Sequence, residues 1–155
     1  MRQLMILFAL VLATSACKKT KEENSKRSTL KVGIISPADG ATVQTGKAVQ
    51  FSWSLSTNTS DPITNKIKIV EITGDQSPEQ AFRGNKPIFE KDSIEYIHTN
   101  KPIFEKDSML YLNVSLPYSA ASPGLVIGKK YAWGVAATQK LTSNESKVSM
   151  FTAIR

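Results

Sequence analysis

Two reactive side chains occur only once each in this chain of 155 residues, the thiol of Cys17 and the imidazole of His98. A single cysteine excludes an intrachain disulfide and a multi-cysteine metal site, and a single histidine excludes a multi-His site. His98 lies in a strand-like segment, residues 94–99. We therefore expect it to be a solvated or hydrogen-bonded polar side chain rather than a catalytic base.

Carboxylates gather at Glu90, Asp92 and Glu95, beside Lys86 and Lys91. Glycoside hydrolysis requires two carboxyl groups across a cleft, and closeness in sequence does not supply a cleft. Calcium requires several oxygens in one tight loop, and the sequence has no loop with so many oxygen ligands. The chain also has neither a P-loop nor a glycine-rich dinucleotide motif. The sequence predicts a charged surface segment, no metal and no cofactor, and a protein that is not an enzyme.

The first sixteen residues have the pattern of a secretory signal peptide. Arg2 precedes an apolar run at residues 4–13, which as a helix would span about 15 Å, half of a bilayer core. Thr14, Ser15 and Ala16 then lead to Cys17. This arrangement resembles the lipobox of bacterial lipoproteins, which implies acyl chains on Cys17 that anchor the protein firmly in a membrane. An ordinary signal peptide, cut after Ala16 to leave a free thiol, stays open.

Residues 18–29 contain no apolar side chain and carry five of the chain's 20 basic residues. Such a stretch predicts a flexible tether between the lipidated cysteine and a folded body at residues 30–155. The expected location is the cell envelope, at the outer membrane, with its periplasmic and surface faces both open. Scattered lysines and a secreted address argue against a nucleic-acid partner.

The body is expected to consist mainly of strands, because apolar residues alternate with polar ones in several segments. One short helix is expected at residues 77–82, where Ser77 is followed by a proline and, three residues on, by Gln80. The expected strands are residues 30–34, 49–55, 66–72, 110–116, 131–137 and 148–154. This pattern predicts an all-β, two-layer antiparallel β-sandwich, its core aromatics being Phe51, Trp53, Tyr131 and Trp133.

Residues 125–137, with a glycine turn, Tyr131 and an alternating apolar run, resemble the E–F corner and F strand of fibronectin type III domains. Residues 35–40 and 49–53 resemble the A–B region of the same family, with Trp53 as its core tryptophan. The resemblance implies a fibronectin type III or immunoglobulin-like sandwich over residues 30–155. It implies no particular partner, because such folds host many functions.

A nine-residue segment, residues 85–93, recurs unchanged at residues 100–108, and Tyr96 aligns with Tyr111. The duplication, residues 85–114, is expected to be an insertion tolerated in a surface connection. The functional alternative is a doubled interaction surface made by Phe89, Phe104, Tyr96 and Tyr111. Each copy also contains Asp-Ser before an aliphatic residue, which resembles an O-glycosylation motif of some Gram-negative envelopes.

Two functions remain open at this point. The favoured one is a non-enzymatic, lipid-anchored envelope protein, whose β-sandwich is a protein-interaction or spacer module for an unidentified envelope partner. The alternative is a carbohydrate-binding module that stacks exposed aromatics such as Tyr96, Tyr111 or Tyr118 on sugar faces of a glycan.

Overall fold

The computed structural model describes residues 28–96, 104–106, 109–118 and 124–155. Within these residues the chain forms ten strands and one short helix, so the expected β-rich class is confirmed. In chain order the elements are β1 (Leu30–Ser36), β2 (Ala41–Gln44), β3 (Val49–Thr57), β4 (Ile63–Glu71), α1 (Pro78–Gly84), β5 (Pro87–Tyr96), β6 (Phe104–Lys106), β7 (Met109–Tyr118), β8 (Lys130–Gln139), β9 (Thr142–Glu145) and β10 (Ser149–Ile154).

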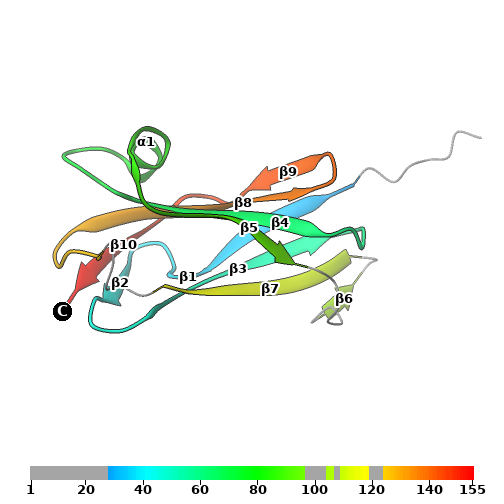
Figure 1. The fold of residues 1–155 in the computed structure, drawn as a ribbon, viewed down its shortest axis with the longest axis horizontal. Coiled ribbons are helices and arrows are strands. Elements are labelled where there is room, and N and C mark those ends of the chain that lie inside the picture. Colours follow the sequence, from blue (N-terminus) through cyan, green and yellow to red (C-terminus); the bar gives the residue numbers. More distant parts are fainter. Residues whose placement is uncertain (1–27, 97–103, 107–108, 119–123) are drawn as a thin grey trace, which may run out of the picture.

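The strands form two sheets that lie one above the other (Figure 1). One sheet has the order β1-β3-β7-β6, and the other has the order β2-β10-β8-β4-β5 with β9 added on β8. Neighbouring strands are antiparallel except for β2 and β10, which run parallel from the pair Ala41 and Phe151 to the pair Gln44 and Ile154. The expectation of purely antiparallel pairing is therefore wrong at this one place.

The core lies between the two sheets and is built from alternate residues of the long strands. The four expected core aromatics, Phe51, Trp53, Tyr131 and Trp133, are at most 1% exposed. Phe51 meets the ring of Trp133 edge-on, with a centroid distance of 4.8 Å, as aromatic pairs prefer. Phe151 is a fifth core aromatic, which the less regular pattern of residues 148–154 did not reveal.

Both tryptophans have their indole N–H groups satisfied inside the core. Trp53 Nε1 donates to Asn65 Oδ1 at 3.1 Å, and Asn65 Nδ2 donates to the carbonyl of Ile94 at 3.1 Å. Trp133 Nε1 donates to the carbonyl of Pro37 at 3.2 Å. Because both rings are fully buried, their role is packing, and neither can serve as a platform for a ligand.

Helix α1 begins as the sequence predicts, with a complete capping box. The Gln80 N–H donates to Ser77 Oγ at 3.2 Å, and the Ser77 N–H donates to Gln80 Oε1 at 2.8 Å. The helix lies on the outer side of the six-stranded sheet, where Ala81 packs with Val70 and Ala132 in a second, small apolar cluster. This cluster fixes the helix against β4 and β8 (Figure 1).

A corner precedes β8. Its tight turn needs Gly128, whose φ is +84°, and the N–H of Val126 donates to the hydroxyl of Tyr131 at 2.8 Å. The Gly128 N–H donates to the carbonyl of Ala153 at 2.8 Å. The corner is thereby bonded to both β8 and β10.

The outer edge of the six-stranded sheet is β5, and it is irregular. Ile94 pairs with Asn65 and Lys91 pairs with Ile67, so Asp92 and Ser93 together face one residue of β4. Two residues opposite one make a β-bulge, and Ser93 has a φ of +56° there. The edge strand is therefore bent at its middle.

The two copies of the repeat do not adopt equivalent positions. In the first copy, Phe89 pairs with Ile69 of β4 in the six-stranded sheet. In the second copy, the described residues 104–106 form β6 of the four-stranded sheet, where Phe104 pairs with Tyr111 of β7. The same sequence thus supplies an edge strand to each sheet.

Candidate functional site

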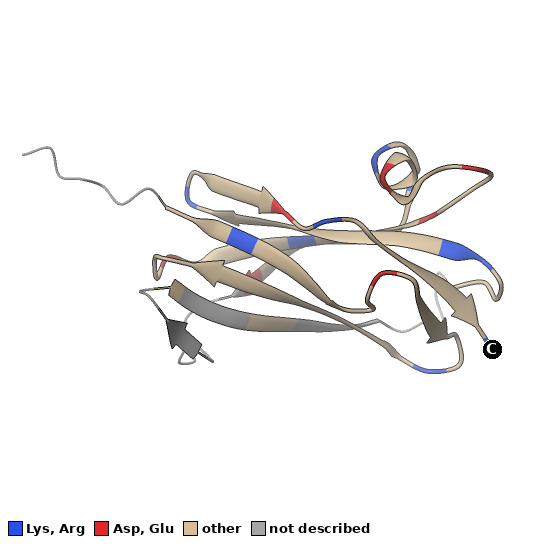
Figure 2. Ribbon diagram, turned by 180° about the vertical axis from the view of Figure 1, so that it is seen from behind, with Lys and Arg blue, Asp and Glu red and all other residues tan. Residues whose placement is uncertain are grey.

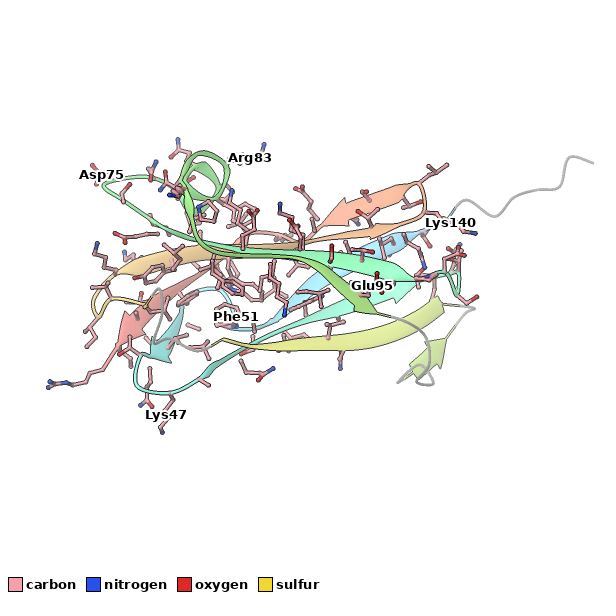
Figure 3. All side chains as sticks on the ribbon, viewed as in Figure 1. Lys47, Phe51, Asp75, Arg83, Glu95 and Lys140 are labelled. Carbon is pink, nitrogen blue, oxygen red and sulfur yellow. The ribbon has the colours of Figure 1, made fainter. Side chains whose placement is uncertain are left out.

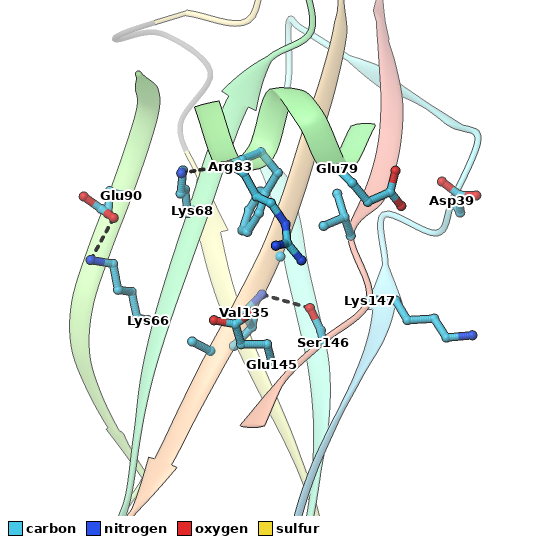
Figure 4. A pocket seen from close by; sticks show the side chains of 14 residues that line it. Asp39, Lys66, Lys68, Glu79, Arg83, Glu90, Val135, Glu145, Ser146 and Lys147 are labelled. Carbon is cyan, nitrogen blue, oxygen red and sulfur yellow. Dashed lines mark hydrogen bonds and ion pairs between the residues drawn. The ribbon is translucent and has the colours of Figure 1, made fainter. Parts of the chain in front are cut away.

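A groove of about 850 Å³ opens on the outer face of the six-stranded sheet, beside α1 (Figure 4). Its floor is formed by β4 and β8, one wall by α1, and the opposite rim by the chain that leads from β9 to β10. The residues that line it are mostly charged or small: Asp39, Lys66, Lys68, Glu79, Phe82, Arg83, Glu90, Gly134, Val135, Ala136, Glu145, Ser146, Lys147 and Val148. We call this the outer groove.

The floor of the outer groove is low because β8 presents small residues outward, Gly134 and Ala136. A Cβ atom at Gly134 would come within 3.1 Å of the Phe82 ring and 3.3 Å of Ser146 Oγ. Both distances are tighter than ordinary van der Waals contact. Glycine therefore lets the ring of Phe82 and the hydroxyl of Ser146 approach the strand.

The α1 wall is held by Lys68. Its ammonium group donates to the carbonyl of Phe82 and lies 4.9 Å from the centroid of the Phe82 ring. A cation over an aromatic face is attracted by the ring quadrupole. Lys68 thus ties the end of α1 to β4 and takes part in the wall of the groove.

A second lysine organises the β5 side of the outer groove. Lys66 Nζ lies 2.8 Å from a carboxylate oxygen of Glu90 and 3.3 Å from both carboxylate oxygens of Asp92. The hydrogen bond to Glu90, followed by that to Asp92, raises the pKa of Lys66 above its ordinary value of 10.5. The sequence places these carboxylates beside Lys86 and Lys91, but they pair with a cation from another strand.

The opposite rim is a hydrogen-bonded backbone segment. The Val135 N–H donates to Ser146 Oγ at 3.0 Å, and the Ser146 N–H donates to the carbonyl of Val135 at 2.8 Å. Ser146 is therefore engaged in structure. Figure 4 shows Arg83 extending from α1 toward this rim, with Glu145 and Lys147 on the rim itself.

The outer groove offers charges of both signs and hydrogen-bonding groups around a small-residue floor. Among the described residues, no group of three or more His, Cys, Asp or Glu gathers as metal ligands would. In the same part of the chain, no helix is long and apolar enough to cross a membrane. Such a lining can bind a polar, charged segment of a partner in the manner of a wet protein interface.

None of the residues expected from the sequence to form a site is among those that line the outer groove in the described part of the chain. Cys17 and His98 lie outside the described residues. Phe89 is half-buried on β5 and packs against the main core. Tyr96 is the last residue of β5 and pairs with Ile63, whereas Phe104 and Tyr111 belong to the four-stranded sheet. The structure describes the backbone but not the side chains of these last three residues, and it divides the four candidates between two sheets.

Sequence reasoning missed the outer groove because its residues come from six separate segments. One signal was present: β4 carries Lys66 and Lys68 at alternate positions opposite the small residues Gly134 and Ala136 of β8. Taken together, these positions indicate a sheet face on which long charged side chains of one strand lie beside small residues of the next. The pairing of β4 with β8 is needed to bring the two patterns together.

Comparisons with known proteins bring no family. No family model matches the chain, and no curated protein matches it. Among the solved structures that it resembles is an alkylpurine DNA glycosylase AlkC of Pseudomonas fluorescens, bound to DNA containing an abasic site analog. The identity is 10%, and the alignment covers 83% of this chain but 30% of that one, with a TM-score of 0.37. A likeness at this level bears on neither fold family nor function.

Proposed function

We propose that this chain is a non-enzymatic, lipid-anchored protein of the bacterial cell envelope, held at the outer membrane, whose body is a protein-interaction or spacer module. The observation that carries the proposal is the position of Cys17. It is the single cysteine, and it directly follows a signal-like apolar run and three small residues. A thiol placed there is the acceptor that lipoprotein maturation uses, according to the lipobox resemblance.

The body is proposed to be a fibronectin type III or immunoglobulin-like sandwich. In such domains a tyrosine near the start of the sixth strand bonds through its hydroxyl to backbone a few residues upstream. Tyr131 makes this bond to Val126. Two facing sheets with a shared aromatic core further support the assignment. Domains of this class commonly act as spacers or binding units on cell surfaces.

The outer groove is the proposed contact site for an envelope protein. Its lining is dominated by charged groups of both signs, and it contains the half-buried ring of Phe82. A partner segment with matched charges gains hydrogen bonds there without burying large apolar area. The expected tether lets the groove search a zone around the anchor, because residues 18–29 join Cys17 to the body.

The anchor is tested with Cys17→Ser in the native envelope, with Ser25→Ala in the tether as the matched control. We expect incorporation of labelled palmitate into the parent chain and the control, and loss of both label and membrane association in Cys17→Ser. Labelled palmitate on Cys17→Ser, or its absence from the parent chain, would reject the lipoprotein assignment.

The groove is tested with the acylated protein by chemical crosslinking in the envelope and mass spectrometry. Arg83→Glu should remove crosslinks to a specific partner, and Lys31→Glu, an exposed charge on β1, should leave them unchanged. Crosslinks that survive Arg83→Glu would place the contact elsewhere. If the parent chain gives no protein crosslink but binds on a glycan array, the carbohydrate-binding alternative replaces the proposal.

A further inference from the structure

Three exposed aliphatic side chains gather at one end of the molecule. Val126 is 51% exposed and Ile127 is 56% exposed, and both belong to the corner before β8. Ile154, at 37%, ends β10 beside them. This end lies opposite the one where β1 begins (Figure 1). We call Val126, Ile127 and Ile154 the end patch.

The backbone holds the end patch rigidly. Besides the corner bonds to Tyr131 and Ala153, the Lys129 N–H donates to the carbonyl of Val126 at 3.2 Å. The Ala153 N–H donates to the carbonyl of Lys129 at 3.0 Å, which fixes the corner beside the strand that carries Ile154. The aliphatic tips therefore project from a braced turn and cannot fold back into the core.

Four cations are close to the end patch along the chain or through a backbone hydrogen bond. Lys129 and Lys130 directly follow the corner, Arg155 follows Ile154, and Lys47 lies in the turn after β2, which is bonded to Ile154 through Thr45. These four side chains are exposed. Figure 2 shows basic segments on a strand and on a turn near the C-terminus, and Figure 3 places Lys47 at that end and Lys140 at the other. Two carboxylates offset part of this charge: Glu71 pairs with Lys129, and Figure 3 also places Asp75 at this end. The four cations still exceed these two carboxylates.

We propose that the end patch binds an anionic phospholipid surface, with Val126 and Ile127 entering the headgroup region and the cations contacting phosphates. This would be a second membrane contact, separate from the acyl chains expected on Cys17. Aliphatic tips beside basic side chains are the combination that peripheral membrane binding uses.

The form of the end patch favours a lipid surface over a protein partner. A stable protein interface buries about 800 Å² on each side and is centred on large anchors, most often Trp, Tyr or Arg in fitted pockets. Two aliphatic residues at the tip of a turn offer neither that area nor such an anchor. A bilayer surface requires only shallow insertion and charge attraction, and both are present here.

The position of the end patch is compatible with an anchored chain. The link from Cys17 to Ser28 reaches at most about 40 Å when fully extended, and a ten-residue strand is about 33 Å long. The tether therefore spans a distance comparable to the body itself. An acylated chain can lie along its own bilayer with both ends in contact, or present the end patch to a second membrane.

The test uses the acylated protein with Ile127→Cys, labelled with an environment-sensitive fluorophore. Because the sulfur of Cys17 carries lipid in that protein, the introduced thiol is the one that reacts. The matched control is Leu141→Cys, which replaces a fully exposed leucine in the β8–β9 turn at the opposite end. Both proteins are placed on vesicles of phosphatidylethanolamine with phosphatidylglycerol, and on vesicles of phosphatidylcholine alone.

We expect the label at position 127 to shift to the blue on phosphatidylglycerol vesicles, with a much smaller shift for the label at position 141. Adding Lys47→Glu should lower the equilibrium constant for docking of position 127, taken from the fraction of blue-shifted label at a fixed phosphatidylglycerol content, by about fivefold or more, since each cation near an anionic surface contributes about that factor. Adding Val126→Asp should abolish the shift while the denaturation midpoint stays unchanged.

The proposal would be overturned if the label at position 127 shows no blue shift on any vesicle, or if the labels at positions 127 and 141 shift equally. Flotation of the protein with the vesicles reports the acyl anchor separately. Flotation without a shift at position 127 therefore rejects the end patch and keeps the anchor. A failure to float rejects the anchor. The measurement is then repeated with Ile127→Cys in a Cys17→Ser background, where position 127 alone carries the label, and the end patch is judged by whether that label shifts on phosphatidylglycerol vesicles.

Discussion

The inner and outer faces of the six-stranded sheet are built from alternate residues of the same strands, yet they are opposite in character. On β8, Tyr131 and Trp133 point inward and are buried among aromatic neighbours, whereas Gly134 and Ala136 point outward. On β4, Ile67 and Ile69 are buried, while Lys66 and Lys68 line the outer groove. Period-two alternation alone produces both faces.

The two faces differ in what their side chains must satisfy. The inner face is sealed by the second sheet, so volume and hydrogen-bond pairing are both constrained there. The outer face is sealed only where α1 covers Val70 and Ala132, and the rest stays open as the outer groove. The position of α1 therefore decides which part of the outer face is available for binding.

The largest expected effect is on the inner face. Trp133→Ala removes a fully buried ring in contact with Phe51 and should lower the free energy of unfolding by about 3–5 kcal/mol. Leu141→Ala, at a fully exposed position, should change it by less than about 0.5 kcal/mol. Urea denaturation followed by tryptophan fluorescence measures both, and in Trp133→Ala the signal comes from Trp53. A loss under about 1 kcal/mol for Trp133→Ala would contradict the sealed inner face.

The next effect concerns a polar group on the same inner face. Asn65→Ala leaves the buried Nε1 of Trp53 without its acceptor and should cost about 1–3 kcal/mol. Thr64→Ala changes the neighbouring residue, which is exposed on the outer face, and should cost less than about 0.5 kcal/mol. Equal costs for the two variants, measured by denaturant midpoint, would break the distinction between the faces.

A smaller effect is expected where the helix covers the outer face. Ser77→Ala removes the cap of α1 and should cost about 1 kcal/mol, while Ser77→Asp should restore most of it. Amide hydrogen exchange should quicken in α1 and leave the inner strands unchanged. Faster exchange throughout β8 would show instead that the helix and the core unfold together.

The smallest effect is expected at the open part of the outer face. Glu90→Gln weakens the pair with Lys66, whose side chain is 44% exposed, and should lower the denaturation midpoint least of the set. Since the pair raises the pKa of Lys66, its contribution is complete below pH 10.5 and disappears as pH rises through the raised pKa. The midpoints of parent and variant should converge above that pH in thermal scans. A difference that persists there would assign it to another cause.

Most of the inner face was predictable from sequence. The strands containing Phe51, Trp53, Tyr131 and Trp133 alternate cleanly, and the capping box of α1 is local. Strands β2 and β9 were not predicted, because each has four residues and few apolar side chains. Their pairing depends on neighbours distant in sequence. Phe151 escaped because the pattern around it is irregular, although the structure buries it completely.

The outer groove and the placement of the repeat were beyond local patterns. Phe89, Glu90 and Lys91 have the same types as Phe104, Glu105 and Lys106, but one trio pairs with β4 and the other with β7. Identical segments carry identical local preferences, so the choice of sheet is set by tertiary context. Tertiary context likewise decides that Glu90 forms its ion pair with Lys66 of β4 rather than with a lysine next to it in sequence.

The bulge at Asp92 and Ser93 also bears on how densely this protein can be packed on a surface. A straight, apolar edge strand is a template on which another chain can add a strand, and many chains held side by side would make that encounter frequent. Strand β5 is the edge of its sheet among the described strands, and its bend interrupts the row of free backbone groups. The charges of Glu90, Lys91 and Asp92 beside the bend further oppose addition. The edge is thus protected against aggregation by the segment that the chain has duplicated.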